Sequence, residues 1–507
     1  MLKRSRALAT VALVALTTGM TAPAWADTLQ EAIALAYRTN PTLLAQRAQQ
    51  RALDESVPQA RSGLRPTIDL SANASYTRTD SEGGSLDVNG DGIPDTTTGG
   101  VTESDVGNIS VGLSQNIWTA GRVGRQINIA EANVLAGREN LRAIEQQVLA
   151  SVIQAYVDVQ RDMEILRIRQ ENITVLRRQL EESSARFEVG EITRTDVAQS
   201  ESRLAQSEAD LATAQAQLSV SRAAYAAVVG QAPADMEVPP PLPGVPADFD
   251  TALDIGLVEN PNIRAAGYQL QGAEAQVAAA RAEYLPSARL TSSYSGSDEL
   301  SGFNPGNRTS FQAGVSVSVP LFTGGLNQSR VAQALEQANA AQIGVEGERR
   351  NVLQDVSSAF AQVVSARATV AAGNEAVRAA TVAAEGVRQE AQVGLRTTLD
   401  VLNQELELRA SQVTLISARR NEYVAQAQLL AAMGRLEGAD LVPEIEQYDP
   451  EANYNRVRFR GALPWDGIVE SIDRIVAPPI VPAADAPDAP IDQQLKSEIV
   501  QTAPSAD

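Results

Sequence analysis

The sequence contains neither histidine nor cysteine, and these two absences exclude much of the chemistry that enzymes use. Without them there is no Ser-His-Asp or Cys-His nucleophile system and no ordinary zinc or haem ligand set. Disulfides and a lipid-modified N-terminal cysteine are excluded as well. The acidic residues are spread along expected helix faces, and no pair stands out as an acid/base couple. We therefore expect a protein that is not an enzyme and needs no cofactor.

Long apolar runs and an excess of positive charge are also missing. Beyond residue 26 no stretch approaches the roughly 18 apolar residues that a transmembrane helix requires. The chain has 42 Lys and Arg against 62 Asp and Glu. Such an acidic surface repels nucleic acid, which we exclude as a partner.

The first 26 residues have the pattern of a secretory signal peptide. A basic start is followed by an apolar stretch at 7–19 and an Ala-Trp-Ala cleavage site at 24–26. We expect the mature chain to begin near Asp27 and to work outside the cytoplasm.

The remaining chain repeats one plan twice. Asn40-Pro41 returns as Asn260-Pro261 at an offset of 220, whereas Gly230 returns as Gly434 at an offset of 204. The difference locates an excess of sixteen residues in the first copy, between Pro66 and Trp118. Repeats at a fixed offset indicate duplicated structural units.

The repeats set the domain boundaries. We expect a first repeat at 27–230, a Pro-rich linker at 231–248 and a second repeat at 249–434. A packed segment follows at 435–476, and an Ala-, Pro- and Asp-rich tail at 477–507 is expected to be disordered.

Each repeat contains two stretches in which apolar and polar residues alternate. The alternation predicts one β-hairpin at about 67–117 and another at about 287–321, with strands of about ten residues. That length suits transmembrane strands with one face toward lipid and one toward a lumen. Two soluble hairpins with one buried face each are the alternative, and the alternation alone favours it. The flanking long helices favour transmembrane strands instead, because they offer no soluble sheet for the hairpins to pack against.

Heptad spacing dominates the helical parts. Apolar residues spaced four and three apart predict one helix from about 120 to 189, roughly 105 Å long at about 1.5 Å per residue, and a return helix at 195–229. The second repeat has the same arrangement with smaller residues.

Two similar strings separate these helices: EVGEITRTDV at 188–197 and QVGLRTTLDV at 392–401. The glycine suits the left-handed position that ends a helix. The Thr-x-x-Asp pattern predicts a capping box that begins the next helix. Both strings are therefore expected to be tight turns at the end of the molecule far from the hairpins. Helix capping alone would explain the presence of aspartate at both Asp196 and Asp400, without any further function.

Together, the duplicated plan, the Asn-Pro pairs and the VGxxTxxDV turns resemble the TolC family of outer membrane efflux proteins over about residues 28–440. The resemblance implies a mainly α fold with transmembrane β structure. In a homotrimer, each protomer would give four strands to a twelve-stranded outer membrane β-barrel, and long helices would form a tunnel through the periplasm.

The resemblance also implies the function. The protein would be a passive exit duct for tripartite efflux or type I secretion. A periplasmic adaptor would connect it to an inner-membrane ABC or proton-driven pump that supplies the energy. The sequence does not separate drugs, peptides and secreted proteins as cargo.

By resemblance, the turns carry a periplasmic gate whose residues are Thr195, Asp196, Arg396 and Asp400. Arg396 would tie the second turn to Thr195 and Asp196 of the first, and Asp400 would contribute to an acidic ring. Two positions depart from the family's best-known member, which has a second aspartate at the position of Asn403 and a tyrosine at the position of Ala391. We therefore expect a weaker acidic ring and fewer links between the two turns.

Two further sets of residues follow from the resemblance. The adaptor would dock on the turns, at Val189, Gly190, Thr193, Val393, Gly394 and Thr397. At the membrane interface, where the strands end, we expect the aromatic residues Trp118 and Phe322.

The sixteen-residue excess contains DVNGDGIPD, which matches the start of a calcium loop. Its expected ligands are Asp87, Asn89, Asp91 and Asp95. The twelfth position, which holds a bidentate glutamate in an EF-hand, is Thr98, so calcium affinity would be weak. A polar turn-forming loop without calcium is the alternative.

Two other classes of protein fit less well. A trimeric coiled-coil structural or adhesive protein has no need for the repeated hairpins and turns. A periplasmic adaptor would carry an inner-membrane anchor and β-rich domains.

Overall fold

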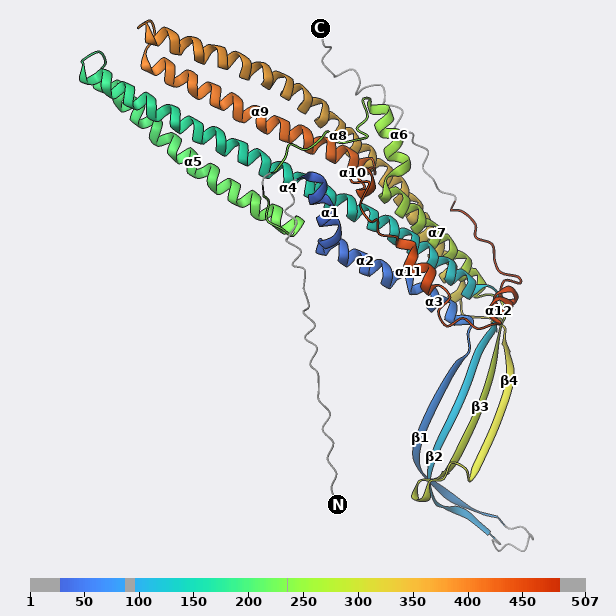
Figure 1. The fold of residues 1–507 in the computed structure, drawn as a ribbon. Helices are drawn as coiled ribbons and strands as arrows, with labels where there is room; N and C mark the ends of the chain where they lie inside the picture. Colours follow the sequence, from blue (N-terminus) through green and yellow to red (C-terminus); the bar gives the residue numbers. More distant parts are fainter. Residues whose placement is uncertain (1–27, 87–95, 235, 484–507) are drawn as a thin grey trace, which may run out of the picture.

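The computed structural model describes residues 28–86, 96–234 and 236–483. The molecule is elongated, with long helices at one end and a sheet at the other (Figure 1). Three predicted features lie outside the described residues: the signal peptide at 1–26, the calcium loop at 87–95 and the tail beyond 483. Among the helices that the structure describes, none combines the length and the apolar character needed to cross a membrane.

The elements follow the same order in both repeats. The first repeat contains α1 (Leu29–Thr39), α2 (Pro41–Asp54), α3 (Ser56–Arg61), β1 (Thr67–Leu86), β2 (Thr96–Trp118), α4 (Arg122–Glu188) and α5 (Arg194–Val229). The second contains α6 (Phe249–Glu259), α7 (Pro261–Ala282), β3 (Ser287–Glu299), β4 (Arg308–Ser318), α8 (Leu326–Gln392) and α9 (Thr398–Ala432).

The Asn-Pro pairs cap helices, as predicted, and also make tertiary contacts. The Asn40 side chain accepts a hydrogen bond from the Thr42 N–H at the start of α2, and its amide donates to the Val228 carbonyl at 2.9 Å. In the second repeat, Asn260 donates to the Ala432 carbonyl at 2.8 Å. Each asparagine therefore ties a short helix pair to the end of its return helix.

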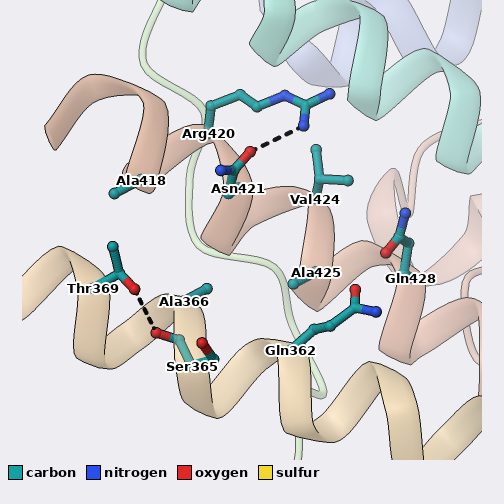
Figure 2. Close-up of a pocket in the computed structure, with 10 residues that line it drawn as sticks. All are labelled: Gln362, Ser365, Ala366, Thr369, Ala418, Arg420, Asn421, Val424, Ala425 and Gln428. Carbon is teal, nitrogen blue, oxygen red and sulfur yellow. Dashed lines mark hydrogen bonds between the residues drawn. The ribbon is translucent and has the colours of Figure 1, made fainter. Parts of the chain in front are cut away.

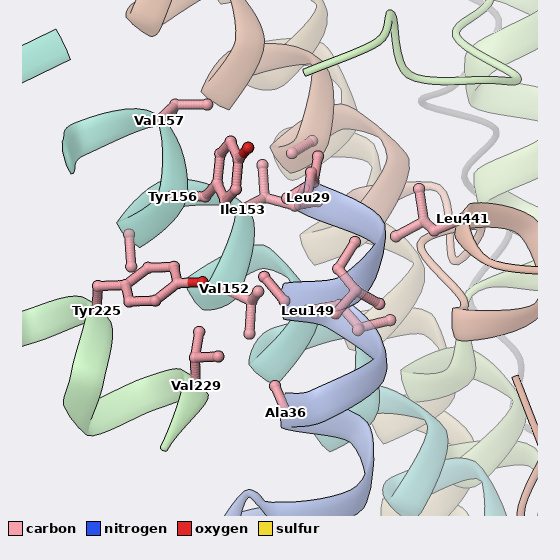
Figure 3. Packing of buried hydrophobic residues seen from close by; sticks show 14 of the residues in the cluster. Leu29, Ala36, Leu149, Val152, Ile153, Tyr156, Val157, Tyr225, Val229 and Leu441 are labelled. Carbon is pink, nitrogen blue, oxygen red and sulfur yellow. The ribbon is translucent and has the colours of Figure 1, made fainter. Parts of the chain in front are cut away.

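The main apolar core lies where α1, α4, α5 and α9 meet (Figure 3). Tyr156 and Tyr225 are fully buried there, with ring centroids 6.4 Å apart. A second core around Phe249 and Phe360 occupies the equivalent place in the second repeat. Much of the predicted stripe on α4 is buried, but Leu180 is only half-buried. The stripe packs against different helices along its length: α2, α3 and α7 toward the sheet, and α5 and α9 toward the turns.

The four strands form one antiparallel sheet in the order β1-β2-β3-β4, which makes β1 and β4 its edge strands. The register places similar residues side by side in rows across the sheet. One row is apolar: Leu70, Val111, Tyr294 and Phe311. The next row, on the opposite face, is all serine: Ser71, Ser110, Ser295 and Ser310. Two of the serine pairs are hydrogen-bonded, Ser71 to Ser110 at 2.7 Å and Ser295 to Ser310 at 2.8 Å.

The strands of the first hairpin are longer than the ten residues expected. β1 and β2 have 20 and 23 residues, whereas β3 and β4 have 13 and 11. The sequence excess of the first repeat falls in this hairpin, which extends past the second one (Figure 1). The alternation fades in the added part, so it does not predict those residues as strand.

The C-terminal segment contains α10 (Gly438–Leu441), α11 (Pro450–Val457) and α12 (Asp466–Asp473). The first two pack on α1 and α2, but α12 contacts β2 and α4 where the sheet meets the helices. The family resemblance implies an equatorial segment at 435–476, which stays a prediction. A buried contact holds α12 at the junction of sheet and helices, because Asp473 accepts hydrogen bonds from the backbone N–H and the hydroxyl of Thr119.

The start of the predicted tail is ordered against helices. The guanidinium of Arg125 donates to the Pro478 carbonyl at 2.6 Å, and the Ala483 N–H donates to the Glu274 carboxylate at 3.0 Å. The composition of 477–507 predicts disorder, whereas backbone groups of Pro478 and Ala483 have partners on α4 and α7.

Candidate functional site: the two helical turns

The turns that join α4 to α5 and α8 to α9 have the same backbone geometry. Gly190 and Gly394 have φ values of +76° and +78°, which favour glycine because other residues are strained there. In each turn the glycine N–H and the following N–H donate back to carbonyls of the last helical turn. This is a Schellman motif, which satisfies carbonyl groups that a helix end leaves unpaired.

Both predicted capping boxes are confirmed. The Asp196 carboxylate accepts hydrogen bonds from the Thr193 N–H at 2.9 Å and its hydroxyl at 2.8 Å. Asp400 accepts the same two bonds from Thr397, at 3.0 and 2.8 Å. These bonds stabilise the carboxylates, so the pKa of each aspartate lies below its usual value. Both aspartates are therefore ionised at neutral pH.

The turns expose apolar side chains at the end of the molecule. Val189, Val393 and Leu395 are 72%, 71% and 76% exposed. Exposed apolar residues gathered at one end indicate an interaction surface rather than a water-facing tip. These residues include two of the predicted docking positions, Val189 and Val393, and Leu395 adds a third exposed apolar side chain.

The gate residues lie at the turns, each within its own hairpin. Thr195 and Arg396 are exposed, and Asp400 is half-exposed. The guanidinium of Arg396 forms an ion pair with Glu390, in the last turn of α8, at 2.8 Å. This pairing raises the pKa of Arg396 above its usual value. The link from Arg396 to Thr195 and Asp196 stays a prediction.

A hydrogen bond that the sequence does not indicate joins the two hairpins near the turns. The guanidinium of Arg203 on α5 donates to the Asn403 side chain on α9 at 3.0 Å. Asn403 lies one helical turn from Asp400 and is one of the two positions that depart from the family's best-known member. The sequence around Arg203 does not indicate this hydrogen bond, because its partner is 200 residues away in the chain.

Further from the turns, a buried carboxylate holds two arginines. Glu405 on α9 is 3% exposed and forms ion pairs with Arg388 on α8 and with Arg409 one turn along α9. Arg409 also lies 3.9 Å from Glu171 on α4. The cluster therefore connects α4, α8 and α9 through charges.

Closer to the middle of the helices, α8 and α9 leave a groove of about 370 Å³ between them (Figure 2). Small residues and side-chain amides line it, with Arg420 as its charged member. Arg420 forms a bidentate ion pair with Asp158 on α4, at 2.7 and 3.1 Å. The groove contains none of the residues singled out from the sequence.

The predicted interface aromatics lie at the other end, where strands give way to helices. Trp118 ends β2, and its indole N–H donates to the Ile475 carbonyl at 3.1 Å. Phe322 lies between β4 and α8 and is 89% exposed. Among the described residues no three acidic side chains gather as a metal site, and the DVNGDGIPD loop falls outside them.

Comparison with known proteins agrees with this architecture. The family model described as "Outer membrane efflux protein" matches residues 32–231 and 253–435, one stretch in each repeat. The outer membrane efflux protein BepC of Brucella suis biovar 1 is 34% identical over 445 residues, which cover 88% of this chain and 92% of BepC. The outer membrane protein TolC of Vibrio cholerae is 27% identical, covering 82% and 93% of the two chains.

A solved structure has the same fold. The open state of the MtrE outer membrane channel of Neisseria gonorrhoeae superposes with a TM-score of 0.67 at 24% identity, covering 81% of this chain and 90% of MtrE. The chain therefore belongs to the outer membrane efflux protein family and is, like its relatives, a channel protein of the outer membrane.

Proposed function

We propose that three copies of this chain assemble into a passive export duct for efflux or type I secretion. Their sheets would close into a twelve-stranded barrel in the outer membrane, and their helical hairpins would continue as a periplasmic tunnel. The register of the sheet carries this proposal. The apolar row through Leu70 and Phe311 suits lipid, and the serine row through Ser71 and Ser310 suits a water-filled lumen.

The edge strands support closure between copies. β1 and β4 each pair with one neighbour in the described sheet. Unpaired backbone groups are costly in lipid, so an open sheet edge would be unfavourable there. Pairing β4 of one copy with β1 of the next would satisfy those groups, and three copies of four strands would close the barrel.

The turns would form a gate at the periplasmic entrance. Three symmetry-related Asp400 carboxylates, ionised at neutral pH, would surround a narrow opening and favour cations. In the closed state Arg396 would exchange Glu390 for Thr195 and Asp196 of the first turn. The exposed position of Arg396 allows that exchange.

The same turns would receive a periplasmic adaptor. Exposed Val189, Val393 and Leu395 would offer apolar contacts, while Gly190 and Gly394 shape the helix ends. Thr193 and Thr397 fix where the return helices begin. The adaptor would connect the duct to an inner-membrane ABC or proton-driven pump, because a passive channel needs an external source of energy.

Conductance in planar lipid bilayers tests the proposal. The purified protein should form channels of low open probability and cation preference. Arg396→Ser should raise the open probability. Arg186→Ser is the control, because Arg186 forms an ion pair with Glu191 at the first turn. Asp400→Asn should lower the cation preference by more than Asp196→Asn, which changes the equivalent cap. Absence of conductance in all of these proteins would contradict the duct.

A further inference from the structure

A patch of large apolar residues is exposed at the junction of sheet and helices. It belongs to α12 and its flanks: Trp465, Ile468, Ile472 and Ile475, of which Ile468 is 65% exposed. Their spacing of three, four and three places them on one side of the helix. Figure 1 shows α12 beside the point where the strands meet the helices.

Two aspartates of α12 face the protein instead. Asp473 is buried and accepts two hydrogen bonds from Thr119. Asp466 accepts a hydrogen bond from Arg65 at 2.9 Å. A water-facing helix buries its apolar side. In α12, Val469 packs against the apolar cluster of the helices, whereas Ile468 and Ile472 stay exposed. Its exposed apolar side therefore suits an apolar environment.

The patch continues the apolar face of the sheet. Leu321 and Phe322, in the segment between β4 and α8, are among the most exposed apolar side chains of the described chain. The indole N–H of Trp118, at the end of β2, donates to the carbonyl of Ile475, two residues after α12. The patch thus lies at the level where the membrane-embedded strands end.

Negative charge does not oppose contact with lipid here. Asp466 is paired with Arg65 and Glu470 with Arg474, and Asp473 is buried. The exposed arc beside the apolar one holds Gly467, Ser471 and Arg474, which suit a headgroup layer.

We propose that α12 is an interfacial helix that lies in the phospholipid surface on the periplasmic side of the outer membrane. Its apolar side enters the boundary between headgroups and acyl chains, while Asp466 and Asp473 hold it to the barrel end. This contact fixes the depth of the channel independently of the gate and the adaptor.

The two tryptophans outside the predicted signal peptide, Trp118 and Trp465, allow a direct test. The mature protein, without the predicted signal peptide and carrying Trp118→Phe, is reconstituted into vesicles of phosphatidylethanolamine and phosphatidylglycerol brominated on the acyl chains near the headgroup. Trp465 fluorescence should fall by about twofold or more relative to unbrominated vesicles, and acrylamide should quench it weakly. Trp465→Phe in the otherwise unchanged protein leaves Trp118 as the fluorophore and so gives the quenching of Trp118 for comparison.

Charge variants supply the control. Ile468→Asp with Ile472→Asp should abolish quenching by brominated lipid and expose Trp465 to acrylamide. Ser471→Asp adds one negative charge beside the apolar side and should leave lipid quenching in place.

Two outcomes overturn the proposal. Strong acrylamide quenching without lipid quenching would place α12 in water. Absence of both would place it against another copy of the chain. Conductance of the same preparation separates this result from the export function, since a conducting channel with unquenched Trp465 overturns only the lipid contact.

Discussion

At the residue scale, the turns show what local sequence predicts and what it does not. The Thr193–Asp196 and Thr397–Asp400 bonds join residues three apart, so the pattern alone predicts them. The Arg203–Asn403 bond joins two hairpins, and no local pattern contains it. The partner of Arg396 also depends on tertiary structure, and the single chain pairs it with Glu390.

Thr397→Ala should destabilise the start of α9 by about 1 kcal/mol, because the cap loses its side-chain acceptor. Hydrogen exchange of the first turn of α9 measures the effect. Thr414→Ala is the control, since the Thr414 hydroxyl donates to the Ala410 carbonyl in the middle of the same helix. Equal loss of protection near residue 397 in both variants would contradict the cap.

The caps should depend on pH in a defined direction. The folded pKa of Asp400 is below its unfolded value of about 3.9, so its contribution is present above about pH 4 and is lost as the pH falls through the folded pKa. The melting temperature of the wild type should therefore exceed that of Asp400→Asn at neutral pH, and the difference should shrink toward zero in acid. A difference that grows in acid would contradict the assignment.

Arg203→Ala should loosen the contact between the hairpins, because Asn403 loses its donor at 3.0 Å. The loss of a hydrogen bond of about 1 kcal/mol corresponds to a severalfold rise in the open probability of the channel. Arg177→Ala is the control, since Arg177 pairs with Glu208 inside the first hairpin. An unchanged open probability in Arg203→Ala would show that the bond does not hold the turns together.

At the scale of elements, periodicity predicts the type of each long segment and tertiary contacts decide its extent. Alternation and heptads give the two hairpins and the long helices. The length of β1 and β2 and the position of α12 depend on contacts, such as that of Asp473 with Thr119, which composition does not reveal.

The two faces of β4 should respond differently to charge. Val315→Lys places a charge on the apolar face and should cost about 2–4 kcal/mol if the residue lies at the middle of the bilayer. Ser316→Lys places it on the polar face and should cost little. The yield of folded protein in outer membranes measures both, and equal yields would contradict a lipid-facing row.

At the scale of the whole molecule, duplication explains the architecture. Asn40 and Asn260 make equivalent contacts, as do the two turns. Each repeat therefore supplies one β-hairpin to the sheet and one helical hairpin to the helical part of the molecule. The offset pattern of the sequence predicts this symmetry. Closing the two sheet edges calls for strands from other copies, and the resemblance to the TolC family implies three copies.

The mass of the protein extracted from outer membranes tests that closure most directly. Native mass spectrometry in detergent should give three copies of the chain, which supply the twelve strands of a closed barrel. A monomer that stays in solution without detergent would contradict the account, because its apolar row and both sheet edges would then face water.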